Sequence, residues 1–264
     1  MVGAYSKEEI IEINKLSQLH NGSSIVFCKT DFILEEFKAI EQLESDVTLI
    51  TGNSDYCITE ELVALAPSNV KHWFCQNKMT ADPRVKSIPI GLENTVECSR
   101  PGHGYVWGHA SPKLEYLTSL SASTPSKLVY SNFNTNTNPM IRGFVRAVSE
   151  KANFITWESH GTDYNSYVQN CLKHLMVVCP EGNGPDTHRF WETLYMGRVP
   201  IARLTRATED FKDLPVVWLN DWTELKDKSL ILDKFDKAKS KSRDLCLNSY
   251  WMRLIINYGK TVSR

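Results

Sequence analysis

Residues 179–202 read CPEGNGPDTHRFWETLYMGRVPIA, and this stretch decides the fold more than any other. The apolar run 175–178 directly before it predicts a buried strand. Gly182 and Gly184 follow in a short polar loop, and a helical segment comes next. Gly197 ends that helix, and a second apolar run begins another strand. The stretch therefore predicts a strand, a glycine loop, a helix and a strand, which is the alternation of an α/β protein.

The start of that helix has the composition of an anion-binding site. Asp186 or Thr187 can cap the helix, and its free backbone N–H groups and positive dipole end favour a phosphate. His188 can bond a phosphate or a sugar, or serve only the structure, and Arg189 adds a cation one turn into the helix. Glu192 lies on the same face as Arg189, where a carboxylate can accept hydrogen bonds from two vicinal hydroxyls. This order of groups suits a nucleoside diphosphate with its ribose, although Arg189 and Glu192 could also be a surface pair and Asp186 only a cap.

The stretch resembles the donor-site signature of the exostosin-type glycosyltransferases. The matching positions are Pro180, Gly182, Gly184, Asp186, His188, Arg189, Trp191, Glu192, Gly197, Pro200 and Ile201. Segments 70–77, 85–94 and 213–222 are also similar to the family, so the resemblance covers residues 70 to 255. Glu181 departs from the pattern, because many relatives carry arginine or another residue there. A carboxylate at this position disfavours a diphosphate unless it points away or bonds the sugar.

The resemblance implies the arrangement called GT-B, in which two Rossmann-like domains face each other across a cleft. The second domain would hold the nucleotide sugar, the first would bind the acceptor and supply the catalytic base, and the last helix would return to the first domain. It also implies an inverting transfer from a UDP-sugar to a hydroxyl of a glycan, with UDP-xylose as one donor among several. A small soluble xylosyltransferase of bacterial or large-virus type is one such possibility.

The rest of the chain agrees with two α/β halves, because strand-like and helix-like segments alternate on both sides of an irregular region from 93 to 126. We place the domains at 1–121, 122–244 and, for the returning helix, 245–264. The expected strands are 24–28, 47–51, 70–75, 85–90, 127–130, 154–157, 175–178, 199–202 and 216–218, and the expected helices are 7–18, 31–44, 58–65, 139–152, 164–173, 188–196 and 245–258.

The ends of these strands supply further candidate site residues. Ser131 and Asn132 end the first strand of the second half, and loops at that end of an open α/β sheet line the cleft. Arg142 lies on the following helix, where the family often places a basic residue that reaches the diphosphate; a surface arginine is the alternative. The expected nucleotide-sugar-binding residues are thus Ser131, Asn132, Arg142, Gly182, Gly184, Asp186, Thr187, His188, Arg189 and Glu192.

The catalytic base should come from the first half, because the donor helix lies behind the leaving group. Asp55 is the first candidate, since it closes a loop after a strand, and Glu93 is the second. His103 and His109, in the irregular region, come next. Replacing a true base by its amide should leave UDP binding intact and reduce transfer by about 10²–10⁴-fold.

Composition excludes several other classes of function. The net charge is −1, so nothing favours nucleic acid as a partner. No apolar run approaches the roughly 20 residues of a membrane span, and the N-terminal residues lack a signal-peptide core. Seven cysteines with irregular spacing favour a reduced compartment over a disulfide framework. A cytoplasmic or otherwise soluble location is therefore expected, or the Golgi lumen if an N-terminal anchor has been trimmed.

A bound metal is not expected, because the sequence has no Asp-x-Asp and its histidines lack metal-ligand spacing. No cofactor is expected apart from the nucleotide-sugar donor. Two alternatives remain open at the level of the sequence: a fucosyltransferase-like enzyme that uses a GDP-sugar, and a non-catalytic glycan-binding relative. A comparison of UDP and GDP binding distinguishes the fucosyltransferase-like alternative. The presence of Arg189 and Glu192 argues against the non-catalytic alternative.

Overall fold

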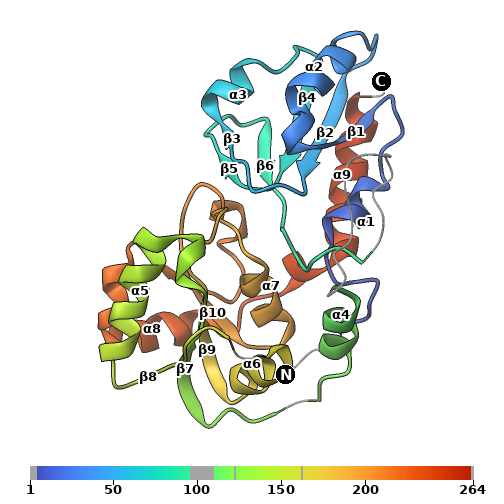
Figure 1. Ribbon diagram of the computed structural model, residues 1–264. Coiled ribbons are helices and arrows are strands. Elements are labelled where there is room, and N and C mark those ends of the chain that lie inside the picture. The colour runs from blue at the N-terminus through green and yellow to red at the C-terminus, as the bar shows by residue number, and fades with distance from the viewer. Residues whose placement is uncertain (1–4, 96–109, 122, 162, 263–264) are drawn as a thin grey trace.

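The computed structural model describes residues 5–95, 110–121, 123–161 and 163–262, and it shows two α/β units, each built on a parallel sheet (Figure 1). The first sheet has strand order β1-β2-β4-β6, and all three pairings are parallel. Its strands are β1 (Ile25–Lys29), β2 (Val47–Gly52), β4 (Val70–Cys75) and β6 (Val85–Ser87), and a small parallel pair joins β3 (Ile58–Thr59) to β5 (Lys78–Met79). The helices of this part are α1 (Ile13–Ser17), α2 (Ile33–Glu41) and α3 (Glu60–Ala64).

The second sheet has strand order β11-β10-β9-β7-β8, again entirely parallel. Its strands are β7 (Lys127–Ser131), β8 (Ile155–Trp157), β9 (His174–Val178), β10 (Val199–Arg203) and β11 (Val217–Leu219). Its helices are α5 (Pro139–Lys151), α6 (Tyr164–Leu172), α7 (His188–Tyr195) and α8 (Lys228–Ala238). Short 3-10 turns lie at Thr30–Phe32, Thr135–Thr137, Glu209–Phe211, Trp222–Lys226 and Asp244–Cys246. The expected fold class of two Rossmann-like units is confirmed.

Local sequence explains where several of these helices begin. Asn138 accepts a hydrogen bond from the backbone N–H of Ile141 (3.3 Å) and Pro139 occupies the first turn of α5. Asp163 caps α6 in the same way, through the N–H of Ser166 at 3.0 Å. The helix α7 differs, because its N-cap residue Thr187 makes no side-chain cap hydrogen bond. The expectation that Asp186 or Thr187 caps α7 with its side chain is therefore wrong, because the Asp186 carboxylate accepts from Ile90, Thr187 and Trp191 instead.

The last helix, α9 (Asn248–Val262), returns to the first unit, where it packs against β2, β4 and α1 (Figure 1). The ring of Tyr258 makes edge contacts with Phe74 at 5.3 Å and His72 at 4.5 Å. The approach is close at Gly259, where an added Cβ would lie 2.7 Å from two side-chain carbons of Ile25. One face of the first sheet is thus completed by the C-terminal end of the chain, as the family arrangement implies.

A helix also occupies part of the region that the sequence analysis expected to be irregular. The helix α4 (Ala110–Thr118) packs on the second unit, with Leu114 and Leu117 buried in the same core as α7. Tyr116 accepts a hydrogen bond from Gln169 of α6 (2.8 Å), which fixes α4 beside that helix. The expectation of irregular structure is wrong for this segment, because its apolar spacing is too short to stand out without the partner surface.

The two units share one hydrophobic core. Buried side chains of α1, β1, β2 and β4 belong to the same cluster as those of α6, α7 and α9, and Trp191, Tyr195 and Trp251 lie within it. Two further clusters cover the outer layers of the first and second sheets. All six cysteines in the described residues are free thiols. The junction between the units is therefore packed like a protein interior rather than joined by a linker.

Candidate functional site

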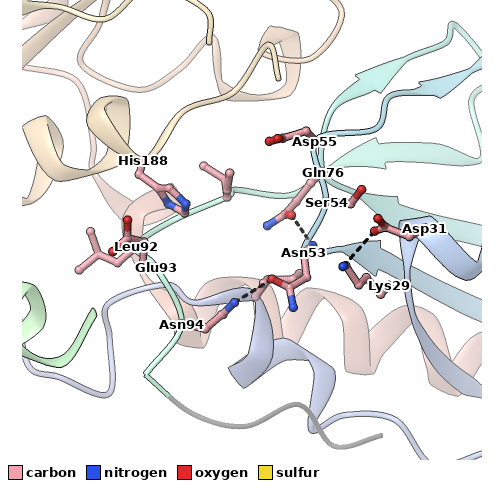
Figure 2. A pocket seen from close by; sticks show the side chains of 12 residues that line it. Lys29, Asp31, Asn53, Ser54, Asp55, Gln76, Leu92, Glu93, Asn94 and His188 are labelled. Carbon is pink, nitrogen blue, oxygen red and sulfur yellow. Dashed lines mark hydrogen bonds and ion pairs between the residues drawn. The ribbon is translucent and has the colours of Figure 1, made fainter. Parts of the chain in front are cut away.

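A pocket of about 310 Å³ lies at the carboxyl ends of the first sheet, opposite the start of α7 (Figure 2). Its walls come from the ends of β1, β2 and β4 and from the segment that follows β6, and His188 closes it from the second unit. The lining residues are Ile13, Lys29, Asp31, Asn53, Ser54, Asp55, Gln76, Ile90, Leu92, Glu93, Asn94 and His188. The carboxyl ends of parallel strands are where open α/β sheets bind ligands.

The floor of the pocket is a fixed network of amides. Asn53 has a left-handed backbone (φ 58°), and its N–H donates to Oε1 of Gln76 at 2.8 Å. Nδ2 of Asn94 donates to Oδ1 of Asn53 at 3.0 Å, and Gln76 is almost fully buried. Such amides offer both donors and acceptors, which suits a ligand with many hydroxyls. Asn53, Gln76 and Asn94 were not predicted from the sequence, since amides scattered over three segments give no motif.

Three carboxylates stand around this floor. Asp55 is exposed and accepts a hydrogen bond from Nδ2 of Asn183 in the signature loop (3.2 Å). Glu93 is paired with Lys113 of α4 at 3.1 Å, so both carboxylates named from the sequence do line the pocket. Asp31 was missed, although it follows the end of β1 much as Asp55 follows that of β2; it pairs with Lys29 at 3.4 Å. His103 and His109 lie outside the described residues.

The glycines of the signature loop are required by close neighbours. A Cβ on Gly184 would lie 2.9 Å from Nδ2 of Asn77, and one on Gly182 would lie 3.0 Å from an amino group of Arg142. Asn77 itself has a left-handed backbone and donates from Nδ2 to the carbonyl of Ser54 at 3.1 Å. The signature loop therefore packs closely against Arg142 of the second unit and against Asn77 of the first unit.

Arg142 holds this loop through hydrogen bonds to backbone carbonyl groups. Its guanidinium donates to the carbonyls of Glu181 (2.8 Å), Asn134 (2.8 Å) and Pro180 (3.3 Å), and its side chain is buried. Burial, together with the neighbouring Arg189, lowers the pKa of Arg142 to about 10, so it stays charged at neutral pH. Arg142 thus holds the backbone that carries the signature, and direct contact with a diphosphate remains a prediction.

Glu181, which departs from the family pattern, has its carboxylate neutralised. Arg203 donates to one oxygen at 2.6 Å and the indole N–H of Trp222 donates to the other at 2.9 Å. The carboxylate therefore points toward β10 and the turn after β11. The charge that seemed unfavourable for a diphosphate is already paired inside the second unit.

Asp186 is the link between the signature and the first unit. Its buried carboxylate accepts from the backbone N–H of Ile90 (2.9 Å), from that of Thr187 (2.8 Å) and from the indole N–H of Trp191 (3.0 Å). These three donors occupy the oxygens that would otherwise cap α7, which explains the missing cap. The carboxylate thus ties the signature to the first unit, and a role of Asp186 in nucleotide-sugar binding stays a prediction.

We predict an unusual pH dependence from this carboxyl group. Burial raises the pKa of Asp186 to about 6, even though the three N–H donors lower it. An unfolded aspartate titrates near 3.9, so the folded chain holds this proton more tightly, and the stabilisation, complete below about pH 4, is lost as the pH rises through about 6.

The measurement is urea unfolding of the wild type and of Asp186→Asn between about pH 4.5 and 7. The stability of the wild type relative to this permanently neutral variant should fall as the pH rises. A relative stability that grows with pH would show that the three donors outweigh burial.

Arg189 and Glu192 lie together in a buried polar cluster between α4, α6 and α7. The guanidinium carbon of Arg189 lies 4.7 Å from the ring centroid of Tyr167, and Glu192 is 3.7 Å from Nζ of Lys113. Burial lowers the pKa of Arg189, but Tyr167, Cys179 and Glu192 outweigh it, so the pKa is raised. Among the described residues, four buried atoms of this cluster have no hydrogen-bond partner: Oε2 of Glu93, the hydroxyls of Tyr164 and Tyr167, and Nη1 of Arg189. Unsatisfied buried polar atoms are costly, and a group of them indicates a place for ligand or water.

The remaining predicted residues lie within the second unit. The hydroxyl of Ser131 is fully buried and lies 2.9 Å from that of Ser149 on α5. Asn132 donates from Nδ2 to the carbonyl of Ser159 at 3.0 Å, and Thr187 is half-buried. The structure therefore gives Ser131 and Asn132 internal partners and does not bring them to the pocket beside His188.

His188 joins the pocket to the signature helix. It is the first residue of α7, and its Nδ1 lies 2.8 Å from the carbonyl oxygen of Gly91. Of the ten residues predicted for nucleotide-sugar binding, His188 alone lines the pocket. Arg189 and Glu192 lie behind it, connected through the pair that Lys113 makes with both Glu93 and Glu192.

Two searches of the described residues give negative findings. No group of three or more His, Cys, Asp or Glu side chains there has an arrangement that could hold a metal ion. Among the same residues, no helix combines the length and the apolar character that a membrane crossing needs.

Comparison with known proteins finds similarity in structure only. No protein-family model matches the chain, and no curated protein matches it in sequence. A UDP-forming α,α-trehalose-phosphate synthase from Burkholderia xenovorans is similar with a TM-score of 0.44 and 8% identity, over 95% of this chain and 77% of that one. An α1,3-fucosyltransferase with GDP-fucose gives 0.43 and 10%, over 91% and 90%. The pneumococcal O-GlcNAc transferase GtfA, in complex with UDP and GlcNAc, gives 0.40 and 11%, over 95% and 59%. Values this low assign neither a donor nor an acceptor to the chain.

Proposed function

We propose that the chain is an inverting glycosyltransferase that moves a sugar from a UDP-sugar to a hydroxyl of a glycan acceptor. The observation that carries the proposal is the pair of Arg189 and Glu192 at the start of α7, with Nη1 of Arg189 buried and without a partner among the described residues. A half-buried arginine with a buried, unpartnered Nη1 at the positive end of a helix is suited to a diphosphate. The adjoining carboxylate can take the ribose hydroxyls, as the resemblance to the exostosin-type enzymes implies.

The pocket on the first unit supports the acceptor half of this proposal. Asp31, Asn53 and Asn94 present carboxylate and amide groups within one pocket of about 310 Å³. Groups of this kind bind sugar hydroxyls by paired hydrogen bonds. The pocket and the Arg189 cluster meet at His188 and Glu93. An acceptor bound in the pocket and a donor bound at the Arg189 cluster would therefore come together beside these two residues.

A transfer of this kind needs a positive charge for the departing UDP, and we assign that role to Arg189 and the α7 dipole rather than to a metal. The donor sugar is an open choice within the proposal, and UDP-xylose, UDP-galactose, UDP-glucuronate and UDP-N-acetylglucosamine are the first to test. A GDP-sugar is the competing donor class.

A thermal-shift panel of nucleotide sugars tests the proposal. UDP and one or more UDP-sugars should raise the melting temperature, because a ligand at 100 times its Kd stabilises a protein by roughly 2.7 kcal/mol. The panel is run in excess EDTA and again with manganese, and the two series should agree. A shift with GDP compounds alone would indicate the fucosyltransferase-like alternative, and no shift with any nucleotide would contradict the function. A shift that requires manganese would contradict metal independence.

A further inference from the structure

We propose that Nε2 of His188 is the base that takes the proton from the acceptor hydroxyl. This inference rests on the proposed function and replaces the first-unit carboxylates, Asp55 and Glu93, in that role. His188 comes from the signature helix, yet its ring lines the pocket formed by the first sheet (Figure 2). It therefore stands where an acceptor in that pocket and a donor held by Arg189 would meet.

The hydrogen bond to Gly91 fixes which nitrogen is basic. A backbone carbonyl only accepts hydrogen bonds, so Nδ1 of His188 donates its proton to the Gly91 oxygen at 2.8 Å. In the neutral imidazole the other nitrogen, Nε2, then carries the lone pair. This is the tautomer that a general base needs, and the partner that holds it belongs to the opposite unit.

The Gly91 carbonyl is itself held rigidly. Gly91 has φ 65° and forms an antiparallel bridge with Glu12, while the next N–H, of Leu92, donates to the carbonyl of Ile11 at 2.8 Å. A fixed acceptor keeps the imidazole in one orientation, which is what a base positioned for proton transfer requires. The geometry is therefore built by the fold and does not depend on a flexible loop.

Each carboxylate around the pocket has one partner, although Oε2 of Glu93 has none among the described residues. Asp55 accepts from Asn183, Glu93 pairs with Lys113, and Asp31 pairs with Lys29. Imidazole is also the side-chain group that most often serves as a general acid or base in enzymes. The charged groups that line the same pocket as His188 are Glu93, Asp55, Asp31 and Lys29, and Asp186 and Arg189 are close to it in the sequence.

The step balances as a single displacement. The acceptor hydroxyl gives its proton to Nε2 of His188 as its oxygen forms a bond to the anomeric carbon of the donor. The bond from that carbon to the diphosphate oxygen breaks, and its electron pair leaves with UDP, whose charge Arg189 stabilises. The imidazolium then returns its proton to solvent.

The test compares His188→Asn with the wild type. The asparagine amide can donate to the Gly91 oxygen from nearly the position of Nδ1, but it carries no base at the position of Nε2. We expect the thermal shift with UDP to be kept, turnover to fall by about 10²–10⁴-fold, and the acidic limb of the kcat/KM–pH profile to disappear. In His188→Ala, added imidazole should restore part of the turnover. His72→Asn, on the α9 side of β4, is the matched control and should transfer normally.

The outcomes separate this inference from the function on which it rests. If the wild type binds and transfers but His188→Asn turns over at a near-normal rate, the inference is wrong and the function stands. If Asp55→Asn instead loses more turnover and the acidic limb, Asp55 is the base, as the sequence alone suggested. If His188→Asn loses UDP binding in parallel with turnover, His188 is a donor-binding residue and not the base. If the wild type binds no nucleotide, the proposed function itself fails.

Discussion

Replacement of Arg189 by alanine is expected to weaken UDP binding by roughly 10- to 100-fold, because a hydrogen bond between charged groups contributes about 1.5–3 kcal/mol. The guanidinium lies over the ring of Tyr167, and its buried Nη1 has no partner among the described residues. A diphosphate would supply that partner, and the alanine side chain would leave the phosphate with only the helix N-terminus. The loss should appear in Kd and also in turnover, since the departing UDP carries more charge in the transition state.

Isothermal titration of UDP into folded Arg189→Ala measures the effect. Arg146→Ala is the matched control, because Arg146 lies exposed on α5, where it pairs with Glu150 one turn away (2.8 Å) and lies 5.8 Å from the ring centroid of Trp157. Equal affinity in wild type, Arg189→Ala and Arg146→Ala would remove Arg189 from the donor site. Calorimetric or spectroscopic unfolding of the variant must accompany the titration, because the same side chain also packs on Tyr167.

The second large effect is a loss of stability when Gly91 is replaced. Gly91→Ala should lower the free energy of unfolding by about 3 kcal/mol or more, or prevent folding, because it adds strain at a positive φ to a steric clash. The φ angle is 65°, and an added Cβ would lie 2.2 Å from the carbonyl oxygen of Ile11. Gly91 forms the bridge with Glu12, and Ile11 directly precedes Glu12, so neither backbone segment can shift without disturbing that bridge.

Gly143→Ala provides the opposite result as a control. Gly143 lies inside α5, and nothing stands within 4 Å of an added Cβ. Alanine there should stabilise the protein by about 0.5–1 kcal/mol, because it is the better helix former. Urea unfolding of both variants checks the pair. A Gly91→Ala protein that is as stable as the wild type would show that the segment after β6 can move away from α1, which would also weaken the argument for a fixed His188.

Much of the fold could be predicted from the sequence because its information is local. The apolar run before Cys179, the glycines of the signature and the alternation of strand and helix each depend on neighbouring residues only, and the structure has a parallel sheet in each half. The same holds for Asp55 and Glu93, which line the pocket because they follow strand ends.

The roles of individual signature residues could not be predicted, because they depend on contacts between distant segments. Asp186 turns toward Ile90, and Gly184 is required by Asn77, in each case across nearly a hundred residues or more of sequence. Lys113 is another such case, since nothing around it in the chain indicates that it pairs with both Glu93 and Glu192. A motif fixes which residues are near the helix terminus, and the opposite unit decides which of them remain open to a ligand.

The return of α9 to the first sheet has a consequence for the order in which the chain folds during synthesis. The N-terminal half leaves the ribosome first, but the face of its sheet that carries Phe74 and Ile25 is covered by Tyr258 and Gly259. That apolar face stays open to water, and to chaperones, until α9 has been translated. All strands of the second sheet, and α5 to α8, are translated before α9. The second unit leaves the ribosome later than the first, yet it can complete its own layers first. The first unit cannot cover its sheet until α9 has been made.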